Sequence, residues 1–161
     1  MHIMNYKIVD YNDKYKNDIS NIIVRNLLEI NVKDYGAEKM QKDALRFTPE
    51  MIAELSKTRK FFVALGGEAV VGIIAVVKNI HGTEHDYAIL TVFVLSEEHG
   101  KGIGRMLIEK AEGYIKSLNG KTASIPASIT AHGFYNKMGY EDDTDIEPHP
   151  EGYIWMKKRF E

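Results

Sequence analysis

The stretch from Glu97 to Leu107 reads EEHGKGIGRML and lies between an apolar run and a helical pattern. Its glycines stand at alternate positions: Gly100, Gly102 and Gly104. Fixing a glycine costs more backbone entropy than fixing any other residue, so three in one short loop need a reason. We expect a ligand to approach this main chain closely. The cationic neighbours Lys101 and Arg105 indicate that the ligand is anionic.

Two established phosphate-binding motifs do not fit this loop. A P-loop requires Ser or Thr after its lysine, whereas Gly102 follows Lys101. A dinucleotide fingerprint, G-x-G-x-x-G, would need its last glycine where Arg105 or Leu107 stands. What remains is a strand, a short glycine loop and an amphipathic helix, whose first N–H groups and dipole together can bind an anion. A tight strand-to-helix turn without a ligand stays open as the alternative.

Upstream of the loop, the pattern first predicts one strand and two helices. The strand is expected over residues 4–9. The first helix is expected over residues 14–31, where apolar residues follow helical spacing: Ile19, Ile22, Ile23, Leu27 and Ile30. The polar segment 31–43 is expected to be a loop. Thr48 and Pro49 form a cap and first-turn pair, which predicts a second helix to about residue 58.

The run 61–78 reads as two strands joined by a turn, and its second half is apolar at nearly every position. Such a strand is buried on both faces. The remaining elements are expected as a strand over 87–95, a helix over 103–118, a strand over 121–126, a helix over 129–138 and a closing strand over 152–160. The order is β-α-α-β-β-β-α-β-α-β, which predicts a mixed α/β sheet in a single domain over residues 1–161.

Composition limits the classes of protein to be considered. The chain has 161 residues, 44% hydrophobic and 27% charged, with a formal net charge of -2, so no overall basic field favours nucleic acid as a partner. Without cysteine, the chain has neither disulfides nor zinc–thiolate sites. We see neither a secretory signal nor an apolar run of about 18 to 20 residues that would span a membrane. We therefore expect a cytoplasmic protein without a membrane partner.

One pair of histidines has a spacing found in metal sites. His81 and His85 form an H-x-x-x-H pattern. That spacing suits a helix, whereas this segment reads as a polar turn. We therefore expect no metal.

Two motifs carry a resemblance to a known family. Residues 94–104, VLSEEHGKGIG, resemble the coenzyme-A loop of the GNAT superfamily of N-acetyltransferases: a strand-ending valine, then Gln or Arg, two residues, Gly, any residue, and Gly or Ala. Residues 131–140, AHGFYNKMGY, are similar to the family's A-x-x-(F/L)-Y-x-x-x-G-(F/Y) segment. The resemblance implies a GNAT-like, mostly antiparallel mixed sheet flanked by helices. It also implies direct attack of an amine on the thioester of acetyl-CoA.

The resemblance implies roles for individual residues. Tyr135 would be the acid that protonates the leaving thiolate; with an ordinary pKa of about 10 it holds its proton at neutral pH. The strand 91–94 would splay from its neighbour, so that a backbone N–H faces the acetyl carbonyl and main-chain groups of Val92 and Val94 reach the pantetheine arm. His99 replaces the family's usual Gln or Arg, and Ser128 replaces a frequent Asn. The residues assigned to coenzyme A are Val92, Phe93, Val94, His99, Gly100, Lys101, Gly102, Ile103, Gly104, Arg105 and Ser128.

Other parts of the reaction stay open. Ala88 stands where many family members have a glutamate base, and Glu84, His85 and Asp86 lie close to an expected turn, so water could remove the proton. Asp34 either holds a cationic amine or belongs to an ordinary polar loop. The expected partner is a small-molecule or peptide amine, and a homodimer is left open. The alternatives are a catalytically silent acyl-CoA-binding module, which the missing carboxylate favours, and a transferase with another acyl donor.

Overall fold

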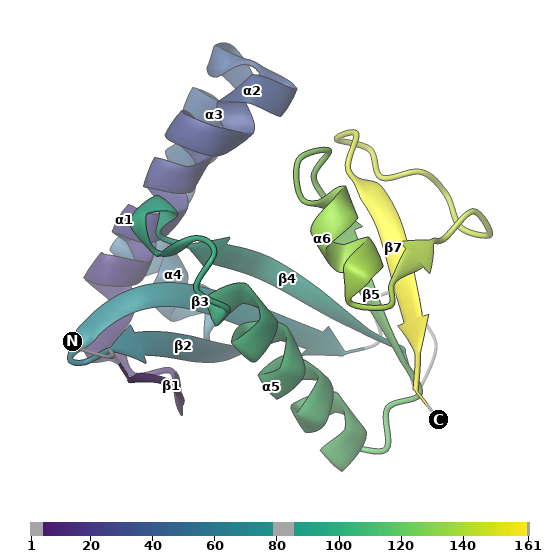
Figure 1. The fold of residues 1–161 in the computed structure, drawn as a ribbon. Helices are drawn as coiled ribbons and strands as arrows, with labels where there is room; N and C mark the ends of the chain where they lie inside the picture. The colour runs from purple at the N-terminus through teal and green to yellow at the C-terminus, as the bar shows by residue number, and fades with distance from the viewer. Residues whose placement is uncertain (1–4, 79–85, 161) are drawn as a thin grey trace.

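The computed structural model describes residues 5–78 and 86–160, and its centre is a seven-stranded sheet (Figure 1). The strands are β1 (Tyr6–Asp10), β2 (Lys60–Gly66), β3 (Ala69–Lys78), β4 (Asp86–Val94), β5 (Thr122–Ala127), β6 (Glu141–Asp142) and β7 (Ile154–Arg159). They lie in the order β1-β2-β3-β4-β5-β7-β6. Only β4 and β5 pair in parallel; the other described pairs are antiparallel. The predicted mixed, mostly antiparallel sheet is confirmed.

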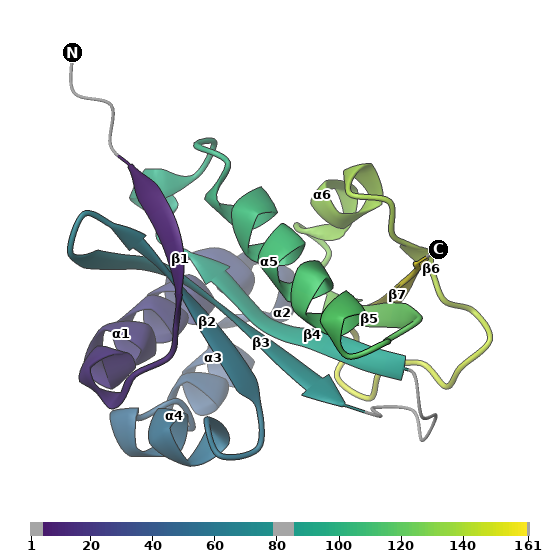
Figure 2. The ribbon, with the colours of Figure 1, turned by 90° about the horizontal axis from the view of Figure 1, so that it is seen from below.

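Helices cover both faces of this sheet. The helical segments are η1 (Asp13–Tyr15), α1 (Lys16–Asn26), the π-helical turn η2 (Leu27–Asn31), α2 (Val32–Tyr35), α3 (Ala37–Ala44), α4 (Pro49–Leu55), η3 (Ser96–Glu98), α5 (Ile103–Ser117) and α6 (His132–Lys137). Figure 2 shows α1, α3 and α4 on one face of the sheet and α5 on the other. Along the described ranges, no helix has both the length and the apolar character needed to cross a bilayer.

Strand β2 shows why the central strands are apolar throughout. Its odd-numbered residues, Phe61, Val63 and Leu65, belong to the core beneath α1, α3 and α4. Its even-numbered residues, Phe62 and Ala64, belong to the core beneath α5. Successive side chains of a strand point to opposite faces, so a strand between two helical layers needs apolar residues at every position. The same alternation holds in β3, with Val71 and Ile74 in one core and Val70 and Ile73 in the other, which confirms the prediction that the second half of the run 61–78 is buried on both faces.

The segment 31–43 is the main difference from the predictions, because it forms α2 and α3 instead of a loop. Gly36 separates the two helices with a φ of 85°. Met40 is fully buried and is the one buried residue of α3. A helix anchored through one buried side chain has too weak an apolar period to be detected in the sequence. The short strand β6 was not predicted either, since two residues carry no period.

The start of α4 agrees with the sequence. The Thr48 hydroxyl accepts a hydrogen bond from the N–H of Met51 at 3.1 Å, and Pro49 occupies the first turn. This side chain satisfies one of the N–H groups that the first turn of a helix leaves without a partner.

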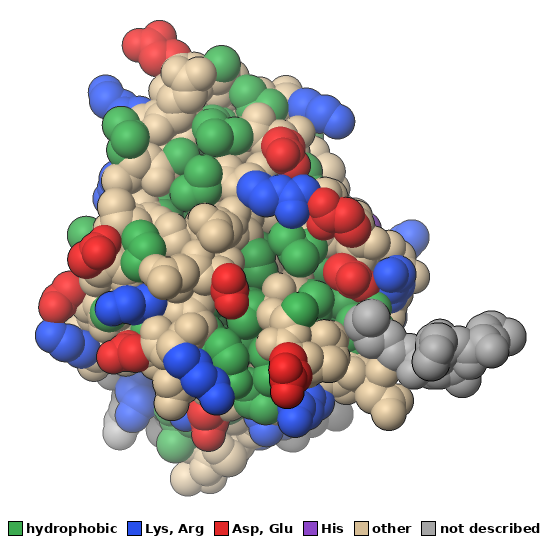
Figure 3. Space-filling view, turned by 90° about the vertical axis from the view of Figure 1, so that its left-hand side faces the viewer, with side chains coloured by type: hydrophobic (Ala, Val, Ile, Leu, Met, Phe, Trp, Pro, Cys, Tyr) green, Lys and Arg blue, Asp and Glu red, His purple; other side chains and the backbone are tan. Residues whose placement is uncertain are grey.

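The surface over the α1–α3 side has a mixed character. Figure 3 shows hydrophobic side chains there, interspersed with acidic and basic ones. Neither sign of charge forms a continuous field on this face.

Replacing Gly113 by alanine is expected to stabilise the protein by about 0.5 to 1 kcal/mol, because glycine in a helix interior loses more backbone entropy than alanine. Gly113 is exposed within α5, and a Cβ there would meet nothing within 4 Å. Thermal melting should show a rise of about 1 to 4 °C. A fall in melting temperature would mean that α5 needs flexibility at this position.

Candidate active site

Strands β4 and β5 are paired at one end and separate at the other. Their parallel register runs from Asp86 with Thr122 to Ala88 with Ser124, although both strands continue beyond these residues. Figure 1 shows β4 and β5 side by side where both strands begin and diverging toward their other ends. A cavity of about 740 Å³ is lined by the separated ends of both strands. The predicted splay of the strand before the glycine loop is therefore present.

A bulge lies in β4 where it borders the cavity. Ile73 of β3 pairs with Phe93, and Ala75 pairs with Leu90, so β4 has one more residue than β3 between these pairs. Thr91, within this bulge, has a φ of 57°. Because the described pairing with β5 has already ended, the main chain of residues 90–94 can offer groups to a ligand in the cavity.

The glycine loop turns tightly into α5. Gly100 and Gly102 have φ values of 80° and 85°, and a Cβ at either would meet nothing within 4 Å. Gly102 is the N-cap of α5 and has no side chain to satisfy the N–H groups of the first turn. These two positions are glycine because of backbone conformation, and the first turn of α5 is open to an anion.

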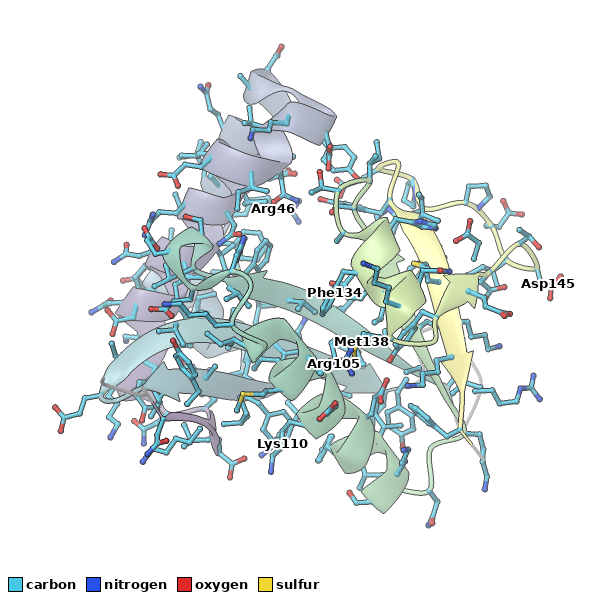
Figure 4. The ribbon with its side chains drawn as sticks, viewed as in Figure 1. Arg46, Arg105, Lys110, Phe134, Met138 and Asp145 are labelled. Carbon is cyan, nitrogen blue, oxygen red and sulfur yellow. The ribbon has the colours of Figure 1, made fainter. Side chains whose placement is uncertain are left out.

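Gly104 has a different reason to be glycine. A Cβ at Gly104 would lie 3.2 Å from Cζ of Phe134, which belongs to α6. The absence of a side chain therefore allows α6 to pack against α5. The interpretation that Gly104 leaves room for a pyrophosphate gains no support from this contact. Figure 4 shows Phe134 and Arg46 on opposite walls of the region between α6 and α3, and both residues line the cavity.

The basic residues of the loop do not all present free charge. Lys101 pairs with Glu98 at 3.0 Å, and the Tyr6 hydroxyl donates to the same carboxylate oxygen at 2.5 Å. The hydrogen bonds from Tyr6 and then Lys101 lower the pKa of Glu98, so this carboxylate stays charged. Glu98 lines the cavity and therefore opposes an anion there. Arg105 is exposed and lies 3.8 Å from Glu109.

Exchanging Glu98 for glutamine is expected to tighten CoA binding about twofold to fivefold, the range expected for one charge pair near the surface. Glutamine can still accept hydrogen bonds from Tyr6 and Lys101, but it no longer repels phosphate or neutralises the lysine. Titration calorimetry at low salt should show the gain, which high salt should reduce. Glu54→Gln, which removes the carboxylate that pairs with Lys57 at an exposed position, is the control. Weaker binding in the Glu98 variant would mean that its charge shapes the loop.

His99 has a defined tautomer. Its Nε2 lies 2.9 Å from the carbonyl oxygen of Val94, which can only accept, so Nε2 carries the proton and donates. The neutral imidazole then has only a lone pair at Nδ1, and donation to a phosphate would require the protonated ring. The same Val94 carbonyl also accepts from Asn26 at 3.3 Å. The carbonyl of Val94, one of the main-chain groups expected to reach the pantetheine arm, is therefore already engaged with two side chains.

Tyr135 lies on α6 and lines the cavity from the side of Phe134. Its side chain is 6% exposed, and its ring is in edge contact with those of Phe134 and Tyr140. Burial raises the pKa of Tyr135 well above its usual value, which corrects the expectation of an ordinary pKa. Ser128 precedes this helix, and its hydroxyl oxygen accepts from the N–H of Ala131 at 3.1 Å. Ser128 lines the cavity, and the hydrogen bonds of the described residues include none in which its O–H is the donor.

The far end of the cavity is bounded by α2 and α3. Asp34 accepts hydrogen bonds from the N–H and the hydroxyl of Thr130, at 3.0 and 2.8 Å, which ties α2 to the turn before α6. Lys39 pairs with Asp43 at 2.9 Å and with Glu151 at 3.5 Å, which ties α3 to the segment before β7. Asp34, Asp43 and Glu151 all line the cavity. Lys39 and the lining Arg46 together balance two of these three carboxylates, so this end keeps an excess of one negative charge.

His149 also lines this end. Burial lowers the pKa of His149, which favours the neutral ring. Its Nδ1 accepts from the N–H of Glu151 at 3.1 Å, so Nε2 carries the proton. The sequence analysis missed His149, Glu151 and Asp43 as site residues. The segments that carry them have no motif, and only the tertiary ties bring them to the cavity.

The candidate bases differ in their placement. Ala88 is fully buried, and Glu84 and His85 lie outside the described residues, as does His81. Asp86 is buried and accepts from Thr122 at 2.9 Å and from Ser124 at 3.4 Å. It does not belong to the described lining of the cavity. Nor do the described residues contain a cluster of three or more His, Asp or Glu side chains that could hold a metal.

Residues 24–140 match the sequence model of the acetyltransferase (GNAT) family. No curated protein matches the chain. Among solved structures, PaiA N-acetyltransferase from Thermoplasma acidophilum in complex with coenzyme A has a TM-score of 0.80 at 15% identity, covering 98% of this chain and 100% of that chain. A GCN5-related N-acetyltransferase from Rhodopseudomonas palustris has a TM-score of 0.80 at 17% identity, with 99% of each chain covered.

A third solved structure, a GNAT-family acetyltransferase from Staphylococcus aureus Mu50, has a TM-score of 0.75 at 18% identity, covering 96% of this chain and 99% of that chain. At these identities the likeness establishes the fold. The match over residues 24–140 covers more than half of the sequence.

Proposed function

We propose, from the premise that this chain belongs to the acetyltransferase (GNAT) family, that it transfers an acetyl group from acetyl-CoA to a primary amine. The observation that carries the proposal is one cavity lined by three features: the glycine loop at the start of α5, the separated end of β4, and Tyr135. A solved structure of the same fold is a complex with coenzyme A, which supports this donor.

The chain's residues fit coenzyme A. Gly100 and Gly102 hold positive φ values, with open space where a side chain would be, so a pyrophosphate can approach the N–H groups at the start of α5. Arg105 adds positive charge at the cavity. On the side where the described pairing with β5 has ended, main-chain groups of residues 90–94 other than the Val94 carbonyl can hydrogen-bond the pantetheine arm, leading the thioester toward Tyr135.

Acetyl-CoA supplies a thioester whose carbonyl carbon the amine nitrogen attacks, forming a C–N bond as the C–S bond breaks. We assign the main-chain N–H groups of the β4 bulge to the carbonyl oxygen, which gains negative charge in the transition state. Tyr135 donates its hydroxyl proton toward the leaving sulfur. The pKa of an ordinary tyrosine already exceeds that of an ordinary thiol, near about 8.5, and burial raises the pKa of Tyr135 further. The O–H therefore stabilises the thiolate chiefly as a strong hydrogen-bond donor.

The amine must lose a proton before or during attack, and we assign that step to water instead of one side chain. Ala88 has no carboxylate, and Asp86 is engaged with Thr122 and Ser124 away from the cavity lining. The rate should therefore rise with pH toward the pKa of the amine itself. If several amines of different basicity gave pH–rate profiles with the same apparent pKa, this assignment would be wrong.

The acceptor enters, in this proposal, from the end bounded by α2 and α3. Asp34→Asn is expected to raise KM for a cationic acceptor about fivefold to tenfold, because the variant keeps a hydrogen-bond acceptor for Thr130 but loses the charge. The thermal shift produced by acetyl-CoA should stay unchanged. Equal KM values for the variant and the parent would remove Asp34 from acceptor binding.

The function is tested with a panel of amines, measuring the release of free thiol from acetyl-CoA. Small amines, diamines, amino acids and peptides with a free N-terminus are each compared with a reaction lacking acceptor. Amine-dependent release supports the enzyme. Binding of acetyl-CoA without release for any amine supports the acyl-CoA-binding module, and release only with another acyl-CoA identifies a different donor.

A further inference from the structure

One residue beside the cavity has a backbone conformation that its side chain disfavours. The described non-glycine residues with positive φ are Thr91, at 57°, and Asn119, at 63°. Asparagine adopts the left-handed region readily, and Asn119 follows the end of α5, where such a conformation is common. A β-branched residue at positive φ is strained. Strain of this kind persists only where surrounding contacts hold it, and it gathers at functional sites.

The strain lies at the point where β4 changes register. Thr91 falls between the pairs Ile73–Phe93 and Ala75–Leu90, where β4 has its additional residue. Glycine is the usual residue at a bulge position with positive φ, because it has no Cβ to clash. A threonine keeps the strain but adds a hydroxyl at this point. The hydroxyl is therefore the feature that calls for an explanation.

Arg59 provides a partner for that hydroxyl. Its Nη1 donates to Oγ1 of Thr91 over a long distance of 3.4 Å. The Arg59 backbone is anchored, since its N–H bonds the carbonyl of Leu55 at the end of α4 at 2.9 Å. Burial lowers the pKa of Arg59, and no carboxylate forms an ion pair with it among the residues that the structure describes. Partial burial of a guanidinium without an anionic partner costs free energy, which hydrogen bonds such as the one to Thr91 offset.

We propose that Arg59 and Thr91 are positioning residues that hold the β4 bulge in the conformation in which its main-chain N–H groups face the acetyl carbonyl. The inference rests on the proposed function. To that function it adds a contact from the turn between α4 and β2, which reaches the reacting group only through the backbone of β4. Neither residue needs to touch the substrate for this role. The geometry of the bulge, and hence the rate of the chemical step, depends on their hydrogen bond.

The test uses a matched pair at position 91. Thr91→Val keeps the size and the β-branch but removes the hydroxyl, whereas Thr91→Ser keeps the hydroxyl and removes the methyl group. We expect Thr91→Val to lower kcat about 10-fold to 100-fold, with KM for acetyl-CoA changed less than about threefold, since small misplacements of reacting groups have effects of this size. Thr91→Ser should restore most of the turnover. Lys57→Gln, at an exposed position two residues from Arg59, is the control.

A double-mutant cycle connects the two residues. Arg59→Gln should lower kcat to a similar extent in the parent, and should add little when Thr91 is already valine. Full turnover in Thr91→Val would overturn the proposal. So would equal losses from Arg59→Gln in both backgrounds, since uncoupled residues do not act through one hydrogen bond. A fall in melting temperature with kcat unchanged would reduce the pair to a structural contact.

A second measurement separates this inference from the proposed function. Because the bulge would contact the acetyl carbonyl, acetyl-CoA should raise the melting temperature of the parent more than CoA does. Thr91→Val should remove that difference and keep the shift common to both ligands. If the parent turns over no amine, the proposed function fails. The role of Thr91 can still be decided, because it predicts that the thermal-shift difference is present in the parent and lost in Thr91→Val. If the parent shows neither turnover nor a difference between the thermal shifts with acetyl-CoA and CoA, both this inference and the proposed function are overturned.

Discussion

Replacing Tyr135 by phenylalanine is expected to lower kcat by about 10² to 10³, the loss found when one donor to a developing negative charge is removed. The interaction with the leaving sulfur is made in the transition state, so KM for acetyl-CoA should change little. The ring contacts with Phe134 and Tyr140 do not involve the hydroxyl. The variant should therefore keep both the packing of α6 and the binding of coenzyme A.

The pH dependence of stability offers a second readout of the same hydroxyl. Burial raises the pKa of Tyr135 above the ordinary value of 10.0, so the folded state keeps a proton that the unfolded chain releases above that pH. This contribution to stability is complete below about pH 10 and is lost as the pH rises further. Denaturant unfolding of the parent should therefore show a steeper alkaline loss than that of the phenylalanine variant.

Tyr114→Phe is the matched control for both measurements. Tyr114 packs against Phe62 on the far part of α5 and does not belong to the described cavity lining. The Tyr114→Phe substitution removes the same hydroxyl oxygen as Tyr135→Phe, but outside the proposed site. Full turnover in the Tyr135 variant would return this residue to a packing role. A loss of turnover together with a large rise in KM would indicate a general disturbance of the cavity.

Replacing Gly102 by valine is expected to weaken coenzyme A binding by at least about 100-fold. At a ligand concentration 100 times the parent's dissociation constant, the stabilisation by the ligand should then fall from about 2.7 kcal/mol to about 0.4 kcal/mol or less. Gly102 is the N-cap of α5 with a φ of 85°. Valine would place a branched side chain in the open space beside the first N–H groups of that helix. The phosphate could then no longer approach the main chain.

The backbone cost of the substitution must be separated from its effect on binding. A non-glycine residue at this φ costs about 1 to 2 kcal/mol, so the variant should melt a few degrees lower without ligand. Gly67→Val is the matched control, because Gly67 also has a positive φ, at 63°, with nothing within 4 Å of a Cβ, and lies in the turn between β2 and β3. That variant should lose similar stability and keep the full thermal shift with acetyl-CoA. A full shift in the Gly102 variant would exclude this loop as the phosphate site.

Local signals carried the sequence predictions that hold. The Thr48 cap, the apolar strands around Gly66 and the glycine loop before α5 depend on residues close together in the chain. Caps, glycines and apolar periods act through contacts over a few residues, so the sequence displays them directly. The segment 31–43 was misread because α3 is held by the single buried residue Met40. A helix that depends on one distant contact has no periodic signal of its own.

The charges and protonation states of the site depend on the tertiary structure instead. Lys101 reads as a free cation, but Glu98 pairs with it and also accepts from Tyr6, which lies 92 positions away. Asp34 reads as a loop residue, but it accepts from Thr130, 96 positions away. The hydrogen bonds from Tyr6 to Glu98 and from Thr130 to Asp34 exist only when folding brings remote segments together.

The sequence alone determined the order of the elements apart from α2, α3 and β6, the glycine loop and the family to which the chain belongs, because each rests on residue types at short spacing. Only the tertiary structure decided that the pKa of Tyr135 is raised, that Thr91 is strained, and that carboxylates gather at the far end of the cavity. Burial and backbone strain are properties of packed neighbours, and the free energy of a charge depends on what surrounds it in space.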